Sequence, residues 1–292
     1  MILIADSGST KTTWVCIEKN GKQAELQPVT SLGINPVRDS EEVVEKAIER
    51  ARENLYQQAQ EAADAPFSPD SVTEVYFFGS GCIPPYSTTV KRILQRTYQH
   101  ANVLVESDML GATLALCGHN EGIACILGTG SNSCLFDGKK VVAQTPALGF
   151  ILGDEGSGAS LGKHLVSDIL KHQLPAHIQQ AFHEETGLTQ AEIINRIYRQ
   201  PQPNRFLASL TPFLERHINE TEVRTLVIQE FRNFLNRNVR NYNRPDLPIH
   251  FVGGITASFH AELEEAIHLE GMQMGHIQSN PIYGMAAYFL EE

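Results

Sequence analysis

One local pattern occurs twice in this chain, and it restricts the possible folds more than any other feature of the sequence. The first copy begins with an apolar run at 2–6, which ends in the turn residues Ser7-Gly8-Ser9-Thr10. A strand-like pattern resumes at 12–18 and is followed by Asn20-Gly21, a strong signal for a hairpin turn. The order of strand, small-residue turn, strand and hairpin turn predicts that the chain begins with antiparallel strands.

The second copy follows about 120 residues later, with the same order of elements. An apolar run at 123–127 ends in Gly128-Thr129-Gly130-Ser131, and a second strand pattern covers 132–136. Asp137-Gly138 then supplies the hairpin signal before 140–143. The two copies share few identical residues, so the pattern repeats while the sequence does not, and two similar units are expected.

Strand and helix patterns alternate after each copy, which is typical of α/β domains with mixed sheets. The length of 292 residues suits two domains, and the polar stretch 118–122 predicts a boundary between residues 1–118 and 119–292. Residues 157–243 have mostly helical patterns. Because the connection between the two domains is short, we expect a cleft between them. The other expected strands are 75–78, 102–106 and 249–252, and the other expected helices are 41–63, 86–99, 108–117, 258–270 and 282–290.

The composition excludes several classes of protein. Lys and Arg number 23 against 34 Asp and Glu, and the net charge of −11 argues against nucleic-acid binding, which requires a basic surface. The sequence shows no basic cluster for an anionic membrane, no apolar run of 18 residues and no secretory signal at its beginning. The five cysteines are odd in number and include no CxxC pair, so we expect reduced thiols and a cytoplasmic protein.

The two small-residue turns are candidate phosphate sites. Small residues let backbone N–H groups point inward and surround an oxyanion, and Asp6 places a carboxylate beside the first turn for a cation. Each turn alone is also compatible with an ordinary hairpin, in which Gly and Ser are common for steric reasons. Two such turns at equivalent positions, 6–12 and 128–132, favour a polyphosphate held from both sides.

Asp108 follows the expected strand at 102–106 and begins the helix at 108–117. One interpretation is a helix N-cap, for which Asp is a preferred residue. The other is a catalytic base at the carboxyl end of a strand, where open α/β sheets place their sites. The interpretations are compatible, and we expect the helix dipole to keep Asp108 ionised and therefore a weak base. A weak base suffices for phosphoryl transfer, which depends mainly on positioning.

Two further glycine-rich segments have both structural and functional interpretations. The segment 153–158, Gly-Asp-Glu-Gly-Ser-Gly, could be a helix start, but its three glycines and two acids are denser than a start requires. Gly253-Gly254 follows the strand expected at 249–252 and either lets a nucleotide approach the backbone or forms an ordinary strand-to-helix turn. The P-loop-like run at 156–163 has the wrong spacing for a true P-loop.

These motifs occur in the order typical of the actin-like ATPase superfamily, which contains sugar kinases, heat-shock chaperones and actin. The run Gly128-Thr129-Gly130-Ser131-Asn132, with the 153–158 loop about 25 residues later, resembles the BadF/BadG/BcrA/BcrD ATPase family and, within it, the N-acetylglucosamine kinases. The resemblance covers nearly the whole chain. It implies two ribonuclease-H-like α/β domains around a nucleotide cleft, with a helical insertion in the second.

The same resemblance implies that the protein phosphorylates an amino sugar with ATP and Mg²⁺, converting N-acetylglucosamine to its 6-phosphate as a cytoplasmic homodimer. Asp108 is then the general base that accepts the proton of the sugar 6-hydroxyl, and Asp6 helps to hold Mg²⁺. The implied sugar contacts are Asn35, Ser80, Asp108, Gly149 and Asp154. The implied ATP-binding residues are Asp6, Gly8, Ser9, Thr10, Lys11, Thr12, Gly128, Thr129, Gly130, Ser131, Gly253, Gly254 and Ala257.

One departure from the family pattern concerns the sugar side of the pocket. The kinases commonly have Gly-Gly-Trp-Gly shortly before the loop that begins at Gly153. Here residues 147–150 are Ala-Leu-Gly-Phe, so the tryptophan is missing. We expect this departure to leave the use of ATP intact, and it leaves open which sugar the pocket accepts.

Two alternative functions are compatible with the sequence. The family also contains ATP-driven activators of radical dehydratases or reductases, in which cysteines of two subunits hold an iron–sulfur cluster. Cys82, before Pro84-Pro85, is the loop-like candidate for such a ligand, and one per chain supplies a dimer with two thiolates where four are needed. The other alternative is a non-catalytic, actin-like nucleotide-binding regulator, against which the presence of Asp108 with both turns argues.

Overall fold

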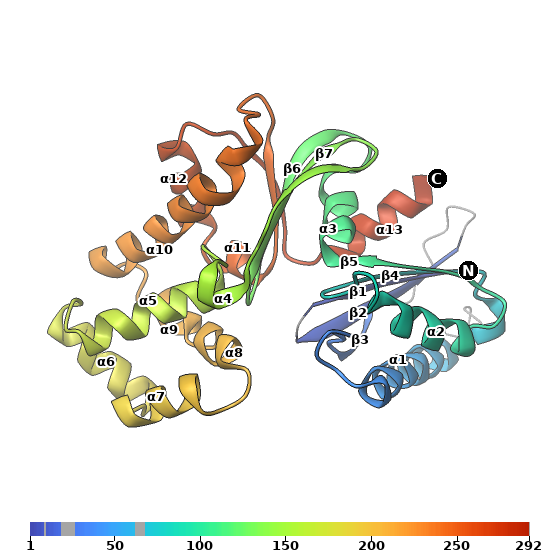
Figure 1. Ribbon diagram of the computed structural model, residues 1–292, viewed down its shortest axis with the longest axis horizontal. Coiled ribbons are helices and arrows are strands. Elements are labelled where there is room, and N and C mark those ends of the chain that lie inside the picture. Colours follow the sequence, from blue (N-terminus) through green and yellow to red (C-terminus); the bar gives the residue numbers. More distant parts are fainter. Residues whose placement is uncertain (9, 19–26, 62–67, 292) are drawn as a thin grey trace. The chain divides into compact units, whose positions relative to one another are not determined.

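The computed structural model describes residues 1–8, 10–18, 27–61 and 68–291 (Figure 1). The chain divides into two compact units, of which the second is Asn120–Ser279. Residues 280–291 pack with the first unit, Met1–His119, whereas the boundary expected from the sequence places all of 119–292 in the second domain. Within the described ranges, no helix is long and apolar enough to cross a membrane.

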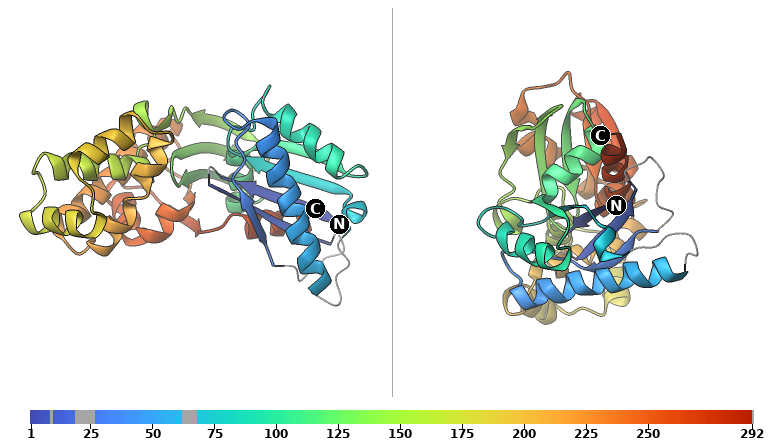
Figure 2. Two further views of the ribbon diagram at one scale, coloured as in Figure 1. Left: turned by 90° about the horizontal axis from the view of Figure 1, so that it is seen from below. Right: turned by 90° about the vertical axis from the view of Figure 1, so that its right-hand side faces the viewer.

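The first unit contains a five-stranded sheet in the order β3-β2-β1-β4-β5. β1, β2 and β3 are antiparallel neighbours, whereas β4 and β5 continue the sheet parallel to β1. Helices α1 and α2 cover one face of this sheet and α3 and α13 cover the other (Figures 1 and 2). The elements are β1 (Ile2–Ser7), β2 (Lys11–Ile17), β3 (Val29–Leu32), α1 (Glu41–Glu61), the 3₁₀ turn η1 (Pro69–Ser71), β4 (Glu74–Gly79), α2 (Ser87–Thr97), β5 (Asn102–Ser107), α3 (Asp108–Cys117) and α13 (Ile282–Glu291).

Apolar patterns account for these elements. The central strand β1 is covered on both faces, and its residues 2–5 are at most 2% exposed. Helix α1 buries one stripe of residues at helical spacing, from Val44 to Leu55, against the sheet. Helices α3 and α13 approach closely at Gly111, where a Cβ atom would lie 2.6 Å from both Met285 and Phe78. The C-terminal helix is therefore an integral layer of the first unit.

The second unit repeats this sheet, with the order β10-β9-β6-β7-β8. β6, β7 and β8 are antiparallel neighbours, and β9 and β10 run parallel to β6. The duplicated arrangement predicted from the two turn patterns is confirmed for the sheets. The strands are β6 (Glu121–Leu127), β7 (Ser131–Asp137), β8 (Val141–Thr145), β9 (Ile249–Val252) and β10 (Met274–Gln278).

A helical segment separates β8 from β9, as the sequence predicted for 157–243. Its interior is rich in aromatic residues, including Phe182, Phe213 and Phe231, each at most 1% exposed. Strand β10 was not predicted. The pattern predicted a third strand after the first hairpin turn without giving its bounds, and β3 occupies that place, while the Asn20-Gly21 turn itself lies outside the described residues. The helices of this unit are α4 (Gly149–Leu152), α5 (Gly158–Leu170), α6 (Ala176–Thr186), α7 (Gln190–Tyr198), α8 (Pro203–Ala208), α9 (Thr211–Arg216), α10 (Thr221–Phe234), the π-helix η2 (Leu235–Val239), the 3₁₀-helix η3 (Arg240–Tyr242), α11 (Gly254–Ser258) and α12 (His260–Leu269).

Candidate active site

In the first unit, three parallel strands end at the same level. The register pairs Ser7 with Gly79 and Gly79 with Ser107, at the last residues of β1, β4 and β5. Asp6 precedes this row by one residue, and Asp108 follows it by one. Because the carboxyl ends of parallel strands form one edge of a sheet, the topology brings the two predicted acids together.

Asp108 is the first residue of α3, and it is not the N-cap that one interpretation proposed. Ser107 is the N-cap, since its Oγ accepts a hydrogen bond from the Leu110 N–H at 3.3 Å. The Asp108 Oδ1 atom accepts from the N–H of Met109 at 2.9 Å, and the Ser80 side chain also hydrogen-bonds this carboxylate. Burial nevertheless raises the pKa of Asp108, and these hydrogen bonds oppose the rise only in part. The pKa of Asp108 thus moves upward, the direction opposite to that expected from the helix dipole.

The pKa of Asp6 is also shifted by its surroundings. Burial, and then the charge of Asp108, raise the pKa of Asp6 to about 7, while the ammonium group of Lys11 opposes the rise. Because the charge of Asp108 disfavours the ionisation of Asp6, a cation beside the two carboxyl groups would be favourable there. Within the described residues, no three His, Cys, Asp or Glu side chains cluster as metal ligands, so the site offers a cation two carboxylates at most.

The first turn connects β1 to β2 at this edge. The Gly8 N–H donates to the Lys11 carbonyl at 3.0 Å, and the side chains of Thr10 and Lys11 are exposed. Ser9 lies outside the described residues. Thr12 is fully buried, and its hydroxyl contacts Ser7 at 2.7 Å and donates to the Leu32 carbonyl at 2.9 Å. Thr12 therefore supports the strand pairing, whereas Gly8 and Thr10 remain on the open turn.

The segment 33–34, which precedes Asn35, holds this turn from behind through Ser7 and Thr10. The Ser7 hydroxyl is fully buried, accepts from the Ile34 N–H at 2.9 Å and donates to the Ile34 carbonyl at 3.1 Å. The Gly33 N–H donates to the Thr10 carbonyl at 3.1 Å, and a Cβ atom at Gly33 would lie 2.5 Å from the Gly8 carbonyl oxygen. The segment before Asn35 therefore packs directly against the turn, which only a glycine permits.

Asn35 and Ser80 belong to neighbouring loops of the first unit. The Asn35 Oδ1 atom accepts from the Val37 N–H at 3.1 Å. It also lies against Gly81, which has a φ of +75° and lacks room for a side chain beside Asn35. The Ser80 N–H donates to the Ser7 carbonyl at 2.9 Å, which joins this loop to the end of β1. The structure thus gathers Asn35, Ser80 and both acids along one edge of the first sheet.

The second turn, 128–131, joins β6 to β7 and is held by the start of α5. The Gly158 N–H donates to the Gly128 carbonyl at 2.8 Å, and the Ala159 N–H donates to the Thr129 carbonyl at 3.1 Å. A Cβ atom at Gly128 would contact nothing within 4 Å, so open space adjoins this turn. Such space is what a phosphate chain needs to approach a backbone.

Asp154 also supports the second turn. Its Oδ1 atom accepts from the Ser131 N–H at 3.1 Å, and its carboxylate lies where a side chain at Gly130 would be. The residue is 8% exposed and has a φ of +57°, and burial raises the pKa of its carboxyl group. The predicted sugar contact is thus at least partly engaged within its own unit.

The segment that departs from the family pattern forms the short helix α4. Gly149 begins it with a φ of +71°, after Leu148 with a φ of +63°. The side chains of Leu148, Ile151 and Leu152 are 64%, 75% and 69% exposed, whereas that of Phe150 packs on the core. The missing tryptophan is therefore replaced by an exposed aliphatic surface just before Asp154.

Gly253 and Gly254, at the end of β9, have different environments. A Cβ atom at Gly253, whose φ is +129°, would lie 2.1 Å from the Leu127 carbonyl oxygen. A Cβ atom added at Gly254 would have nothing within 4 Å, and Ala257 is exposed on the next turn of α11. Gly253 therefore serves the packing of β9 on β6, and Gly254 faces the open edge.

The two glycines form a matched pair for mutagenesis. We expect Gly253→Ala to cost at least about 2 kcal/mol of stability, because it combines a collision with an unfavourable φ. We expect Gly254→Ala to leave the melting temperature nearly unchanged and to raise the KM for ATP about three- to tenfold, because the methyl group fills open space. Thermal unfolding and steady-state kinetics measure both effects. An unchanged KM for ATP in Gly254→Ala contradicts an approach of the nucleotide to this turn.

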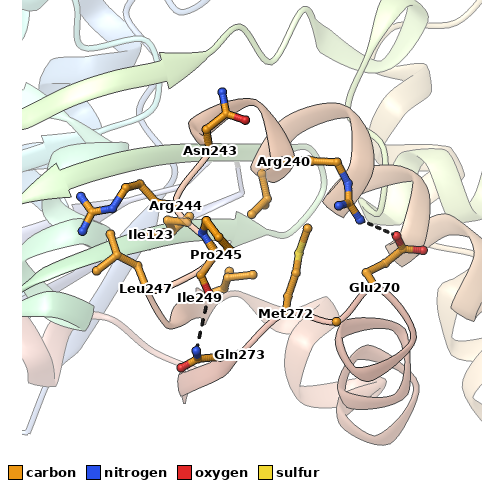
Figure 3. A pocket seen from close by; sticks show the side chains of 12 residues that line it. Ile123, Arg240, Asn243, Arg244, Pro245, Leu247, Ile249, Glu270, Met272 and Gln273 are labelled. Carbon is orange, nitrogen blue, oxygen red and sulfur yellow. Dashed lines mark hydrogen bonds and ion pairs between the residues drawn. The ribbon is translucent and has the colours of Figure 1, made fainter.

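A separate cavity of about 180 Å³ lies at the opposite, amino-terminal ends of β6, β9 and β10 (Figure 3). Its floor is apolar and includes Ile249 and Met272. Arg240 on its rim pairs with Glu270 at 2.7 Å, and Arg244 pairs with Asp246 at 2.8 Å. This cavity does not adjoin the turns of the candidate site.

Cys82 does not have the exposure that the activator hypothesis requires. It is 2% exposed, and burial, followed by the charge of Asp108, raises the pKa of its thiol to about 12. All five cysteines of the chain are buried. A thiol in this position is not available to a cluster shared with a second subunit, so the hypothesis loses its loop ligand.

Comparisons with known proteins agree with this geometry. A protein from Porphyromonas gingivalis described as a "Putative N-acetylglucosamine Kinase" is 42% identical over 100% of this chain and 99% of its own, with a TM-score of 0.92. A protein of the same description from Chromobacterium violaceum is 17% identical over 99% of this chain and 98% of its own, with a TM-score of 0.76. A ROK family glucokinase from Streptomyces griseus, in complex with glucose and AMPPNP, is 13% identical over 99% and 98%, with a TM-score of 0.56. No family model and no curated protein matches the chain.

The duplicated mixed sheets, with small-residue turns at their strand ends, define the fold of the actin-like ATPases and sugar kinases. The two more distant structures support the fold alone. The identity of 42% over the full length goes further: the chain belongs to the BadF/BadG/BcrA/BcrD ATPase family, among the sugar kinases of that family. It is an ATP-dependent sugar kinase.

Proposed function

We propose that this kinase transfers the γ-phosphoryl group of ATP to the 6-hydroxyl of N-acetylglucosamine. The observation that carries the reaction is the position of Asp108, half-buried beside Asp6 and Ser80 at the carboxyl edge of the first sheet. The choice of sugar is supported by the 42% identical protein from Porphyromonas gingivalis.

Two turns would bind the phosphates of ATP. In the first unit these are the N–H groups of Ser9 and Thr10, with Lys11 as a nearby cation, while Gly8, whose own N–H donates to the Lys11 carbonyl, leaves room for the phosphates beside the turn. In the second unit they are the N–H groups of Thr129 and Gly130, because those of Gly128 and Ser131 already donate within the unit, to the Gly130 carbonyl and to Asp154. Gly254 and Ala257 would lie against the adenosine. The open space at Gly128 and Gly254 supports this assignment, since a ligand can approach the backbone there.

The residues of the first unit fit a magnesium ion. Asp6 supplies an anionic oxygen, and the raised pKa of both carboxyl groups means that a bound cation would be favoured there. Mg²⁺ takes one or two carboxylates and completes its octahedron with phosphate oxygens and water, so a larger cluster of protein ligands is unnecessary. When bound, the ion neutralises charge on the phosphates during transfer.

Asp108 would orient the sugar hydroxyl and accept its proton. Its raised pKa brings the carboxylate nearer to the range in which a general base is effective. The hydrogen bonds from Met109 and Ser80 fix the orientation of the carboxylate. Phosphoryl transfer depends on such positioning more than on base strength.

The sugar would be contacted by Asn35, Ser80 and Asp154 in addition to Asp108, with Gly149 shaping the wall where the family has tryptophan. We expect N-acetylglucosamine to give the highest kcat/KM among N-acetylglucosamine, N-acetylmuramic acid, glucosamine, N-acetylmannosamine and glucose. Coupled assay of ADP release measures these values, and NMR of the product locates the phosphate. A higher kcat/KM for another sugar, or a phosphate on another hydroxyl, contradicts this substrate assignment.

We also propose that the enzyme works as a homodimer in the cytoplasm. Five buried thiols suit a reducing compartment. Light scattering of the purified protein should give twice the mass of one chain, and a monomer mass contradicts the dimer.

A further inference from the structure

Glu230, in α10, is a buried acidic side chain that the proposed reaction does not use. It is 2% exposed, and a carboxylate in such a position is costly unless other groups compensate it. Its Oε2 atom accepts from the Ser160 hydroxyl at 2.6 Å. Its Oε1 atom accepts from Asn233 at 2.9 Å and faces the His164 Nε2 atom at 3.3 Å. The short bond to Ser160 connects α10 to a different helix.

Ser160 lies in the first turn of α5, which holds the second phosphate turn. The three N–H groups that begin this helix all have acceptors. Those of Gly158 and Ala159 donate to the 128–131 turn, and that of Ser160 donates to the N-cap hydroxyl of Ser157 at 3.2 Å. The side chain of Ser160 then joins the same helical turn to Glu230. The first turn of α5 is thus held by hydrogen bonds to the 128–131 turn and by a hydrogen bond to α10.

The contact at Glu230 is one of a series along α10 and its π-helical extension η2. Phe234, one helical turn later, packs on Gly156, where an added Cβ atom would lie 3.0 Å from the Cβ atom of Phe234. Asn238, a further turn on, donates to the Glu155 carboxylate at 3.3 Å. Residues spaced by four on one face therefore support the 153–158 loop and the start of α5 together.

We infer that Glu230 is a positioning residue for the phosphates of the nucleotide, acting through Ser160 and the first turn of α5 on the 128–131 turn. The inference rests on the proposed binding of ATP at that turn. Among the described residues, the side chains of Glu230 and Ser160 form no hydrogen bond with the turn itself. They would instead align the N–H groups of Gly158 and Ala159, which donate to the Gly128 and Thr129 carbonyls of the turn.

Binding of Mg·ADP, measured by titration calorimetry, tests this role separately from catalysis. We expect Ser160→Ala to raise the Kd for Mg·ADP about five- to tenfold, because the hydrogen bond that joins the first turn of α5 to α10 is lost. The KM for the sugar should stay within about twofold of its original value. Glu230→Gln keeps an acceptor for the Ser160 hydroxyl and should bind Mg·ADP like the unmodified protein. His164→Gln, which alters the other side of the same carboxylate, is the matched control and should also bind normally.

The inference is overturned if Ser160→Ala binds Mg·ADP normally, or if its affinities for nucleotide and sugar fall equally. If Ser160→Ala does not fold, Glu230→Gln and Glu230→Met supply the comparison, since they match in length and differ in their ability to accept the hydroxyl. Equal Kd values for that pair then overturn it. Failure of the unmodified protein to bind Mg·ADP would instead contradict the proposed function.

Discussion

The Asp108→Asn variant should lose about 10²–10⁴-fold in kcat while remaining folded, since this is the usual contribution of a positioned acid–base group. Asparagine preserves the size of the side chain and an acceptor for the Met109 N–H. It cannot take the proton of a sugar hydroxyl. Replacing a carboxylate whose pKa is raised by burial does not cost stability, because the charge itself is unfavourable there. Steady-state kinetics and thermal unfolding of the same preparation measure both effects.

The neighbouring Ser107→Ala variant is the control for this experiment. It removes the N-cap hydroxyl of α3, which should cost about 1 kcal/mol of stability, and leaves Asp108 in place. Its kcat should remain within a few-fold of the original value. Near-full turnover by Asp108→Asn, or an equal loss of kcat in Ser107→Ala, would contradict the role of Asp108 as the base.

The Asp6→Asn variant should change activity and stability in opposite directions. The folded protein holds a proton on Asp6 more tightly than the unfolded chain does, since the pKa is raised from 3.8 to about 7. The stability of the unmodified protein without ligand therefore falls as the pH rises between these two values. Asparagine carries no such charge, so the variant should be more stable above pH 7, by on the order of 2 kcal/mol. Its kcat/KM for Mg·ATP should fall at least about 100-fold, because a metal ligand is lost.

Chemical denaturation at pH 5 and pH 8, without nucleotide, measures the stability difference. The advantage of Asp6→Asn should be smaller at pH 5, where Asp6 is mostly protonated in the folded protein, and larger at pH 8. A variant that is less stable than the original protein at pH 8, or an advantage that does not change with pH, would contradict this account of Asp6.

The duplicated sheets were predictable because their signals are local. Each copy places a turn of small residues between two apolar runs, and dipeptides such as Asp137-Gly138 mark where strands reverse. Parallel strands that end in register then bring Asp6 and Asp108 together without any further information. The candidate acids of the first unit thus follow from the pattern of the sequence and from sheet topology.

The supports of the site were not predictable, because they depend on contacts between segments that are distant in the sequence. The Ser7 hydroxyl binds the backbone at Ile34, and Ser160 binds Glu230, 70 residues away. The final helix joins the first unit through close packing at Gly111, which no local pattern reveals. Burial likewise decided the pKa of Asp108, whereas the sequence showed only the nearby helix start.

The most direct test of the proposed activity is ADP release by the purified protein with Mg·ATP, measured before and after addition of N-acetylglucosamine. We expect slow release without sugar and a strong, saturable rise when N-acetylglucosamine is added. Unchanged ADP release with N-acetylglucosamine and with every other sugar of the panel would contradict the assignment of this chain as an amino-sugar kinase.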